Sequence, residues 1–260
     1  MAARNKEKSI NGKSFDLVAQ MESLYTTLDY YISLPPRTIK NPNTYWSQAT
    51  DPDGQTRNRL NESRCYLTNL SEELNFIRAL RPGKMLDIGC GPGWLLSAID
   101  PLWDKHGIEP SREAAAIAAK HAKIYSELFE EVDLQNQRFE LVVMYHVVEH
   151  MKDPISALQS VFNMLATGGH LILGTPDFDS GAARRYGTNY RLLHDPTHIS
   201  LFSNDSMHRL LRDLGFQIQK VSYPFFDTSY FTDETLLRLL RPDGISPPFY
   251  GNFMTFYCTI

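Results

Sequence analysis

Cysteine is scarce in this sequence, with three residues in 260, at Cys65, Cys90 and Cys258. Their odd number and wide spacing indicate neither a disulfide framework nor a cysteine-based zinc site. Free thiols suit the reducing interior of a cell, so we expect a cytoplasmic protein.

Long apolar runs are also lacking. The most apolar stretch, residues 141–148, contains His146 and is far too short to cross a bilayer. The first 14 residues are charged and polar, without the apolar centre of a secretory signal. We therefore expect a soluble protein with no membrane insertion.

No large excess of one charge is present, since 26 Lys and Arg face 30 Asp and Glu, a formal charge of −4. A general nucleic-acid or anionic-membrane binder needs a basic face, so this balance argues against both partners. The 42% hydrophobic and 22% charged content is ordinary for a globular protein. The length predicts one core with an appendage, and the oligomeric state is left open.

A glycine-rich loop dominates what is present. Residues 84–96 read KMLDIGCGPGWLL, a buried strand that breaks at Gly89-Cys90-Gly91-Pro92-Gly93 and resumes as a helix near Trp94. Alternate glycines leave no side chains above the turn, and the helix directs free N–H groups and its positive dipole end at the same place. Such a unit binds the polar part of a cofactor.

The glycine spacing separates the cofactor classes. A dinucleotide fingerprint reads G-x-G-x-x-G, but its last position is Trp94 here, and no Gly-Lys-Ser/Thr of a phosphate loop follows. The string LDIGCGPG resembles the first motif of class I S-adenosylmethionine-dependent methyltransferases. The resemblance implies that S-adenosylmethionine is the cofactor and that this motif binds it through Asp87, Gly89, Cys90 and Gly91.

Two later motifs extend the resemblance in the correct order. Glu109 ends the next strand, 20 residues beyond Gly89, where a carboxylate can accept the two hydroxyl protons of a ribose. The segment HGIEPS resembles the family's second motif, with Pro110 and Ser111 opening a helix. In SELFEEV the resemblance implies that Glu127 meets the adenine amino group and Leu128 gives backbone contacts, although a solvated Glu127 is an equal alternative.

The fold that the resemblance implies is a Rossmann-like α/β domain. Strand–helix alternation from residue 84 predicts a doubly wound, mainly parallel seven-stranded sheet, whose last strand is antiparallel. The predicted strands cover residues 84–88, 106–110, 123–125, 139–147, 170–176, 216–223 and 252–260. We expect a disordered tail at 1–14, a helical cap at 15–80 with helices over 15–34 and 62–80, and the methyltransferase domain at 81–260. Insertions on the acceptor side are expected at about 176–204 and 224–250.

Histidines at strand ends suggest the chemistry. In YHVVEH the resemblance places Tyr145 and His146 beside the methionine part of the cofactor. A hydroxyl acceptor benefits from a general base, so we predict O-methylation with His146, His150 or His198 as that base. The spacing of His194 and His198 resembles a metal pair, but Pro196 interrupts any helix between them and no H-E-x-x-H pattern exists, so no metal is expected.

The acceptor is the least defined partner. By analogy alone it is a small molecule, a glycan or a lipid-linked sugar. Aromatic residues of both insertions are candidate pocket walls, or else they pack internally: Tyr186, Tyr190, Phe202, Tyr223, Phe225, Phe226, Tyr230, Phe231, Phe249 and Tyr250. Tyr45 and Trp46 of the front segment are expected to close over the cofactor in the same way. Two alternatives stay open, an inactive S-adenosylmethionine-binding scaffold or regulator and, less favoured by the glycine spacing, a nicotinamide oxidoreductase.

Overall fold

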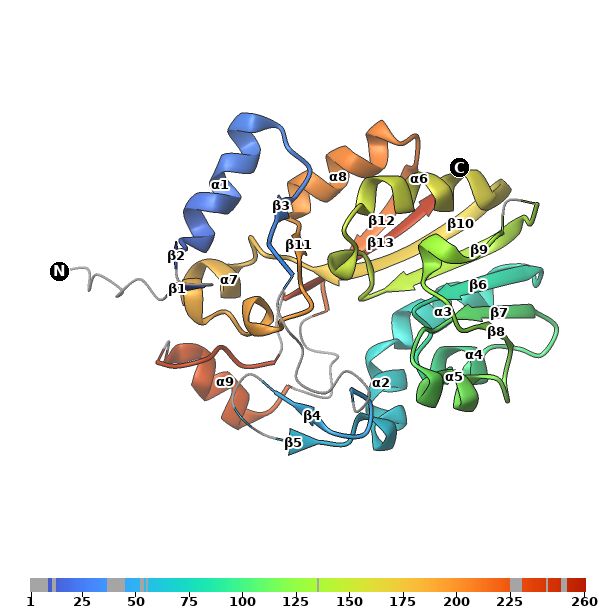
Figure 1. Cartoon of the computed structure of the whole chain (residues 1–260), viewed down its shortest axis with the longest axis horizontal. Helices are drawn as coiled ribbons and strands as arrows, with labels where there is room; N and C mark the ends of the chain where they lie inside the picture. Colours follow the sequence, from blue (N-terminus) through green and yellow to red (C-terminus); the bar gives the residue numbers. More distant parts are fainter. Residues whose placement is uncertain are drawn as a thin grey trace.

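The computed structural model describes residues 9–10, 13–36, 45–51, 54, 56–134, 136–224, 231–241, 243–248 and 252–260. Its centre is a seven-stranded sheet in the order β12-β13-β10-β9-β6-β7-β8 (Figure 1). The strands are β6 (Lys84–Ile88), β7 (Asp104–Ile108), β8 (Lys123–Tyr125), β9 (Phe139–Tyr145), β10 (Leu165–Pro176), β12 (Gln217–Ser222) and β13 (Phe253–Thr259).

Strand directions follow the prediction. β8, β7, β6, β9 and β10 pair in parallel, whereas β13 lies antiparallel to both β10 and β12. The strand order reverses at β6, with β7 on one side and β9 on the other. Ligands of open parallel sheets bind at the carboxyl ends of the strands beside such a switch point. The Rossmann-like architecture is confirmed.

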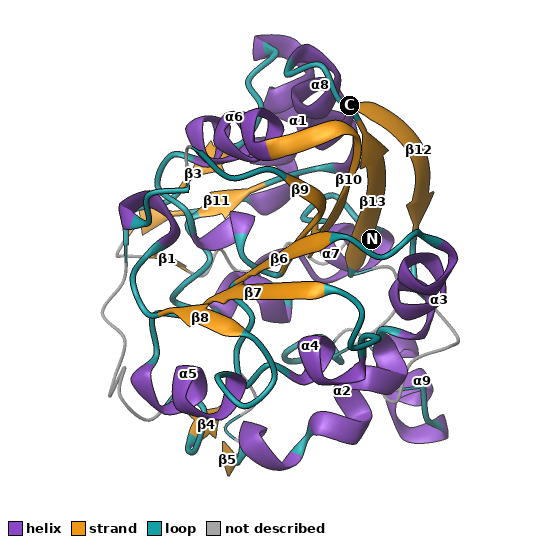
Figure 2. Cartoon of the chain, turned by 90° about the vertical axis from the view of Figure 1, so that its right-hand side faces the viewer, coloured by secondary structure: helices purple, strands orange, loops and turns teal. Residues whose placement is uncertain are grey.

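Each face of the sheet buries its own helices, because alternate strand residues point to opposite faces. Leu86, Val142 and Leu171 pack with α6 (Pro154–Met164) and α8 (Asn204–Asp213). Met85, Leu141 and Ile172 pack on the other face with α2 (Ser63–Asn69), α3 (Ser71–Ala79), α4 (Trp94–Ala98) and α5 (Arg112–Ala118). Figure 2 shows the two layers on opposite sides of the sheet.

A third apolar cluster joins the front of the chain to the segment after β10. Leu17, Met21 and Leu24 of α1 (Leu17–Thr27) pack against residues of α7 (Gly181–Tyr186) and of the chain that follows it. The short strand β3 (Ile32–Ser33) pairs antiparallel with β11 (Ser200–Leu201). Figure 1 shows this lobe beyond the carboxyl ends of the sheet strands. The 3-10 turns η5 (Gly187–Asn189) and η6 (Arg191–His194) complete it.

The front segment differs from the predicted continuous helices. α1 ends at Thr27, and its C-cap Leu28 has a left-handed φ of 61°. The second predicted helix breaks at Leu70 into α2 and α3. α3 packs on the sheet, since Leu74 and Ile77 belong to its core. Short strands also occur, namely β4 (Ala49–Thr50) with β5 (Thr56–Arg57) and, within the predicted disordered tail, β1 (Ser9–Ile10) with β2 (Lys13–Ser14).

The remaining described elements are the turns η2 (Arg59–Asn61), η3 (Phe129–Glu131) and η4 (Val148–His150), and the helix α9 (Asp233–Leu240). Among the described residues, no helix combines the length and apolar character that crossing a bilayer requires.

Candidate active site

The glycine loop after β6 has the conformation that its sequence predicts. Gly89, Gly91 and Gly93 have φ values of 71°, 54° and 76°, a region that side-chain-bearing residues rarely adopt. A Cβ at Gly89 would collide with Val147, and one at Gly91 would lie 2.5 Å from the Trp46 ring. The loop therefore needs glycine both for its backbone angles and for the close approach of neighbours.

Glu109 lies beside this loop. Its Oε2 accepts a hydrogen bond of 2.9 Å from the Gly91 amide, and its Oε1 accepts one of 2.8 Å from the Ser111 amide. The residue is 6% exposed. Burial raises the pKa of this carboxyl, while the two amide hydrogen bonds and one from the Trp46 indole oppose that rise. The carboxylate is thus fixed at the end of β7, where the sequence predicts the ribose ligand.

Asp87 and Cys90 face the interior beneath the loop. Asp87 is 4% exposed, and burial, reinforced by the charge of Glu109, raises its pKa to about 8. Burial also raises the pKa of the Cys90 thiol. A Cβ at Gly107 would lie 2.7 Å from the Cys90 Sγ, so the Cys90 side chain packs against β7.

A row of aromatic rings runs along the loop. The centroids of Trp46 and Trp94 are 6.0 Å apart, those of Trp94 and Tyr66 are 5.3 Å apart, and Tyr66 lies 6.5 Å from Tyr145. The sequence predicts Trp46 and Tyr145 near the cofactor but gives no role to Tyr66 or Trp94. Periodicity places these two on helices, and only the packing of α2 beside α4 brings them together.

The two residues predicted to contact the adenine are exposed to solvent. Glu127 and Leu128 follow β8 and are exposed, Leu128 at 51%. The Leu128 amide donates to Glu131 Oε2 at 3.3 Å. Pro110 is likewise exposed, at the start of the turn into α5. The adenine assignment of Glu127 and Leu128 remains a prediction.

His146 occupies a strained position at the end of β9. Its φ of 58° is left-handed, which is uncommon for a residue with a side chain. Its Nδ1 lies 3.3 Å from Glu149 Oε1, and its ring packs against Tyr145 and Phe253 at centroid distances of 4.5 and 4.6 Å. The next residue, Val147, packs against Gly89 of the glycine loop, so His146 lies one residue from a side chain that meets the loop.

Glu149 is a wholly buried carboxylate with 0% exposure. Burial alone would raise its pKa, but the His146 hydrogen bond and the charges of His150, His146 and His198 outweigh burial and lower it to about 2. Its Oε2 accepts a hydrogen bond of 3.1 Å from Thr175 Oγ1. An ionised Glu149 is therefore held among three histidines.

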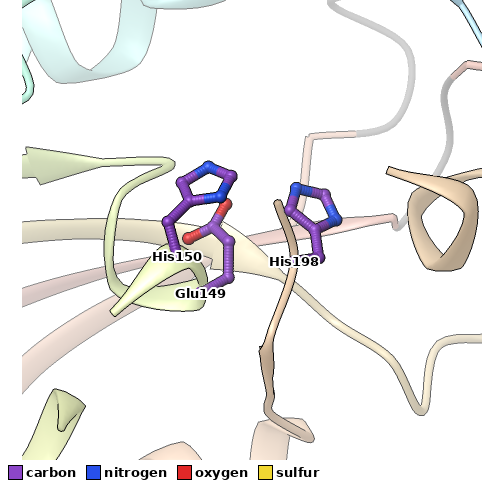
Figure 3. Close-up of side chains that lie close together, drawn as sticks. All are labelled: Glu149, His150 and His198. Carbon is purple, nitrogen blue, oxygen red and sulfur yellow. The ribbon is translucent and has the colours of Figure 1, made fainter. Parts of the chain in front are cut away.

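His150 and His198 meet across two segments, with ring centroids 5.0 Å apart. His150 Nδ1 lies 3.0 Å from the Thr197 carbonyl, and His198 Nδ1 lies 2.6 Å from the Leu192 carbonyl. Figure 3 shows both rings beside the Glu149 carboxylate. His194, by contrast, turns its Nε2 to the Thr188 carbonyl at 2.8 Å. The structure thus brings together His146, His150 and His198, the three predicted bases.

Three of the predicted pocket aromatics are core residues. Tyr190 and Phe202 are 0% exposed and Tyr186 is 3% exposed, so these three cannot line an open acceptor pocket. Tyr223 and Phe231 are partly exposed, at 47% and 37%. Five candidates lie outside the described residues: Phe225, Phe226, Tyr230, Phe249 and Tyr250.

Known relatives of the chain share this domain. Residues 62–221 match a family described as a methyltransferase domain. A ubiquinone biosynthesis O-methyltransferase of Aliivibrio fischeri is 24% identical over 155 residues, 55% of this chain and 64% of that protein. The corresponding Bradyrhizobium protein is 33% identical over 113 residues, covering 40% and 43% of the two chains. The chain therefore spans less than two thirds of the length of these two relatives.

Solved structures agree in fold. A Thermotoga maritima protein described as a SAM-dependent methyltransferase, possibly a histamine N-methyltransferase, has a TM-score of 0.55 and 26% identity, covering 77% of this chain and 95% of its own. A plantazolicin methyltransferase bound to SAH, at 18% identity, has a TM-score of 0.54 and covers 94% and 98%.

The residues present fit the cofactor of these proteins, because the glycine loop offers bare backbone and Glu109 offers a fixed carboxylate where the sequence predicts the ribose ligand. The family match, the sheet order and the site geometry lead to the same conclusion. The chain belongs to the class I S-adenosylmethionine-dependent methyltransferases.

Proposed function

We propose that this methyltransferase transfers the methyl group of S-adenosylmethionine to a hydroxyl oxygen of a small molecule, with His146 as the general base. The observation that carries the proposal is the pair of His146 and the buried Glu149 at the end of β9, next to the glycine loop. S-adenosylmethionine supplies a methyl group that its sulfonium already activates. The chain has to position the two reactants and remove the hydroxyl proton.

Glu149 orients His146 so that it can accept that proton. A carboxylate oxygen only accepts, so His146 Nδ1 donates its N–H to Glu149 Oε1 and leaves the lone pair on Nε2. Nε2 would then accept the proton of the acceptor hydroxyl as the oxygen–methyl bond forms and the methyl–sulfur bond breaks, with S-adenosylhomocysteine as the leaving group. The ionised Glu149 would stabilise the imidazolium that forms. Thr175 holds the other carboxylate oxygen, so the dyad is oriented before substrate arrives.

The glycine loop and Glu109 would position the cofactor. Glu109 would hold the ribose hydroxyls, and the amides of the Gly89–Gly93 loop would lie against the polar part of the cofactor. The rings of Trp46 and Tyr66 border the same space and would exclude water from the reacting atoms.

The names of the Aliivibrio and Bradyrhizobium relatives favour oxygen as the acceptor atom, whereas the name of the Thermotoga protein suggests nitrogen. A neutral amine needs only desolvation and alignment, so a carboxylate-oriented histidine would have no proton to remove before attack. The His146–Glu149 pair therefore supports a hydroxyl acceptor.

The test is His146→Ala, assayed with radiolabelled S-adenosylmethionine against a panel of phenols, sugars and amines. We expect a loss of about 10²- to 10⁴-fold in kcat on hydroxyl acceptors, the usual contribution of a general base, with little change in SAH affinity. His121→Ala, at an exposed position outside the site, is the matched control. Full turnover by the His146 variant would contradict the assignment, and SAH binding without turnover of any acceptor by the wild type would favour an inactive scaffold.

A further inference from the structure

Three metal-ligating side chains converge from segments 48 residues apart in the sequence. Glu149 and His150 lie in the turn after β9, and His198 lies in the insertion after β10 (Figure 3). The candidate ligand atoms of these residues all lie within 4.8 Å of one another. Glu149 and His198 are buried and His150 is half-buried, so the group has one solvent-facing side.

The hydrogen bonds of the two histidines fix which nitrogen each presents. A carbonyl oxygen only accepts, so His150 donates Nδ1–H to Thr197 and His198 donates Nδ1–H to Leu192. In its neutral form each ring therefore carries a lone pair on Nε2. Metal-binding histidines characteristically donate their other N–H to a carbonyl or carboxylate, which fixes ring orientation and tautomer.

The charges also suit a cation. Glu149 brings a negative charge with 0% exposure, and the Asp195 carboxylate lies 4.0 Å from His198 Nε2. The Glu149 and Asp195 carboxylates beside the two imidazoles supply negative charge that a divalent ion would balance.

We propose that Glu149, His150 and His198 bind one divalent transition-metal ion that fastens the insertion after β10 to the catalytic turn after β9. Two imidazoles with one carboxylate are a ligand set that zinc and non-haem iron use. Bonds of about 2.0–2.2 Å put tetrahedral ligand atoms roughly 3.4 Å apart, so the widest pair here would close by roughly 1.4 Å on binding. The proposal departs from the sequence expectation of no metal, which considered His194 as the partner of His198.

The ion would reinforce contacts that already join the two segments. The Ile199 amide donates to the Glu149 carbonyl at 2.9 Å, and Ser200 Oγ donates to the Met151 carbonyl at 2.7 Å. A metal bridge here closes a loop of about 48 residues and limits the unfolded chain more than a local contact does. This role does not depend on the identity of the methyl acceptor, but it shares Glu149 with the proposed base His146.

The experiment uses the full chain, stripped with a chelator and titrated with Zn²⁺ in a calorimeter. We expect one site per chain and a rise in melting temperature on adding Zn²⁺. His198→Ala and His150→Ala should each weaken binding by more than the roughly 10- to 100-fold that loss of a ligand-orienting group costs, and should remove the thermal shift. His194→Ala, whose ring faces the Thr188 carbonyl, should bind Zn²⁺ like the wild type.

Co²⁺ provides a second readout on the unmutated chain. Visible absorption bands typical of mixed nitrogen and oxygen coordination, displaced by one equivalent of Zn²⁺, would support the site even if an alanine variant folded poorly. Absence of Zn²⁺ binding by the stripped chain would overturn the proposal. So would binding that the His150 and His198 substitutions leave as tight as in the His194 control, because the ion would then lie elsewhere.

Discussion

At the scale of single residues, the site contains two buried carboxylates, each with defined hydrogen-bond partners. Glu109 accepts two backbone amides and Glu149 accepts a hydroxyl and an imidazole. Each carboxylate is nearly or wholly buried, yet each is hydrogen-bonded through both oxygens. Such groups hold fixed directions, which is what recognition of a ribose and orientation of a base both require.

Glu109→Gln tests the ribose assignment. The amide keeps one acceptor oxygen but replaces the other with a donor, which faces the amide N–H of Gly91 or Ser111 and cannot accept a ribose hydroxyl. We expect SAH affinity to fall by about 10- to 100-fold, the equivalent of 1.4–2.8 kcal/mol, measured by calorimetry. Glu127→Gln is the comparison at an exposed position and should cost less than Glu109→Gln. The reverse ranking would move the main cofactor carboxylate to the loop after β8.

At the scale of elements, the strand–loop–helix unit and the segment around Trp46 form one local structure. The Trp46 ring lies over Gly91, packs edge-on against Trp94 and hydrogen-bonds to Glu109. The loop amides and the indole therefore share one carboxylate. A ligand that takes both oxygens of Glu109 has to displace the indole N–H from it.

Gly91→Ala, compared with Gly168→Ala, separates backbone strain from the close approach of Trp46. Both glycines have positive φ, 54° and 73°, but a Cβ at Gly168 meets nothing within 4 Å whereas one at Gly91 meets Trp46 at 2.5 Å. Each variant should lose about 1–2 kcal/mol of unfolding free energy from the left-handed angle. Only Gly91→Ala should also weaken SAH binding at least about tenfold, as measured by calorimetry. Equal SAH affinity in the two variants would show that the loop does not contact the cofactor at Gly91.

At the scale of the whole molecule, the front of the chain and the insertion after β10 form a lobe on the carboxyl edge of the sheet (Figure 1). Tyr190 joins that lobe to the sheet, because its hydroxyl lies 3.2 Å from the carbonyls of Asp177 and Asn252, which flank β10 and β13. Asp177, at the point where β10 enters the lobe, is 8% exposed. Burial raises the pKa of its carboxyl to about 6.

This raised pKa predicts how global stability depends on pH. Between the unfolded value of 3.8 and the folded value of about 6, the folded chain holds more of the Asp177 proton than the unfolded chain does. The contribution of Asp177 is therefore present below pH 3.8 and is lost as pH rises through about 6. The full loss is about 3 kcal/mol, at 1.36 kcal/mol for each unit of pKa.

Asp177→Asn should remove that dependence, because an amide oxygen can still accept from the Asp179 amide, as Asp177 Oδ1 does at 2.9 Å. Relative to wild type, the variant should gain up to about 3 kcal/mol between pH 4 and pH 7, measured by denaturant unfolding at both pH values. Other carboxyls titrate in both proteins and cancel in the difference. A difference that does not change with pH would mean that burial does not shift the titration of Asp177.

The sequence by itself determined the parallel sheet, its antiparallel last strand, the glycine loop and the position of Glu109. These features depend on local patterns, namely the alternation of strands and helices, the glycine spacing and a carboxylate at a strand end, so neighbours in sequence suffice to reveal them. The class of cofactor followed from the same local string.

Only the tertiary structure decided which distant side chains meet. The pairing of Tyr66 with Trp94, the burial of Tyr190 and Phe202, and the approach of His198 rather than His194 to within 4.8 Å of Glu149 each join segments that the sequence keeps apart. Long-range contacts arise from helix packing and from the way the insertion folds back on the turn after β9, and no sequence period encodes them. The residues predicted to bind the methyl donor can therefore be identified from the sequence, whereas the cluster of histidines and Glu149 forms only in the folded chain.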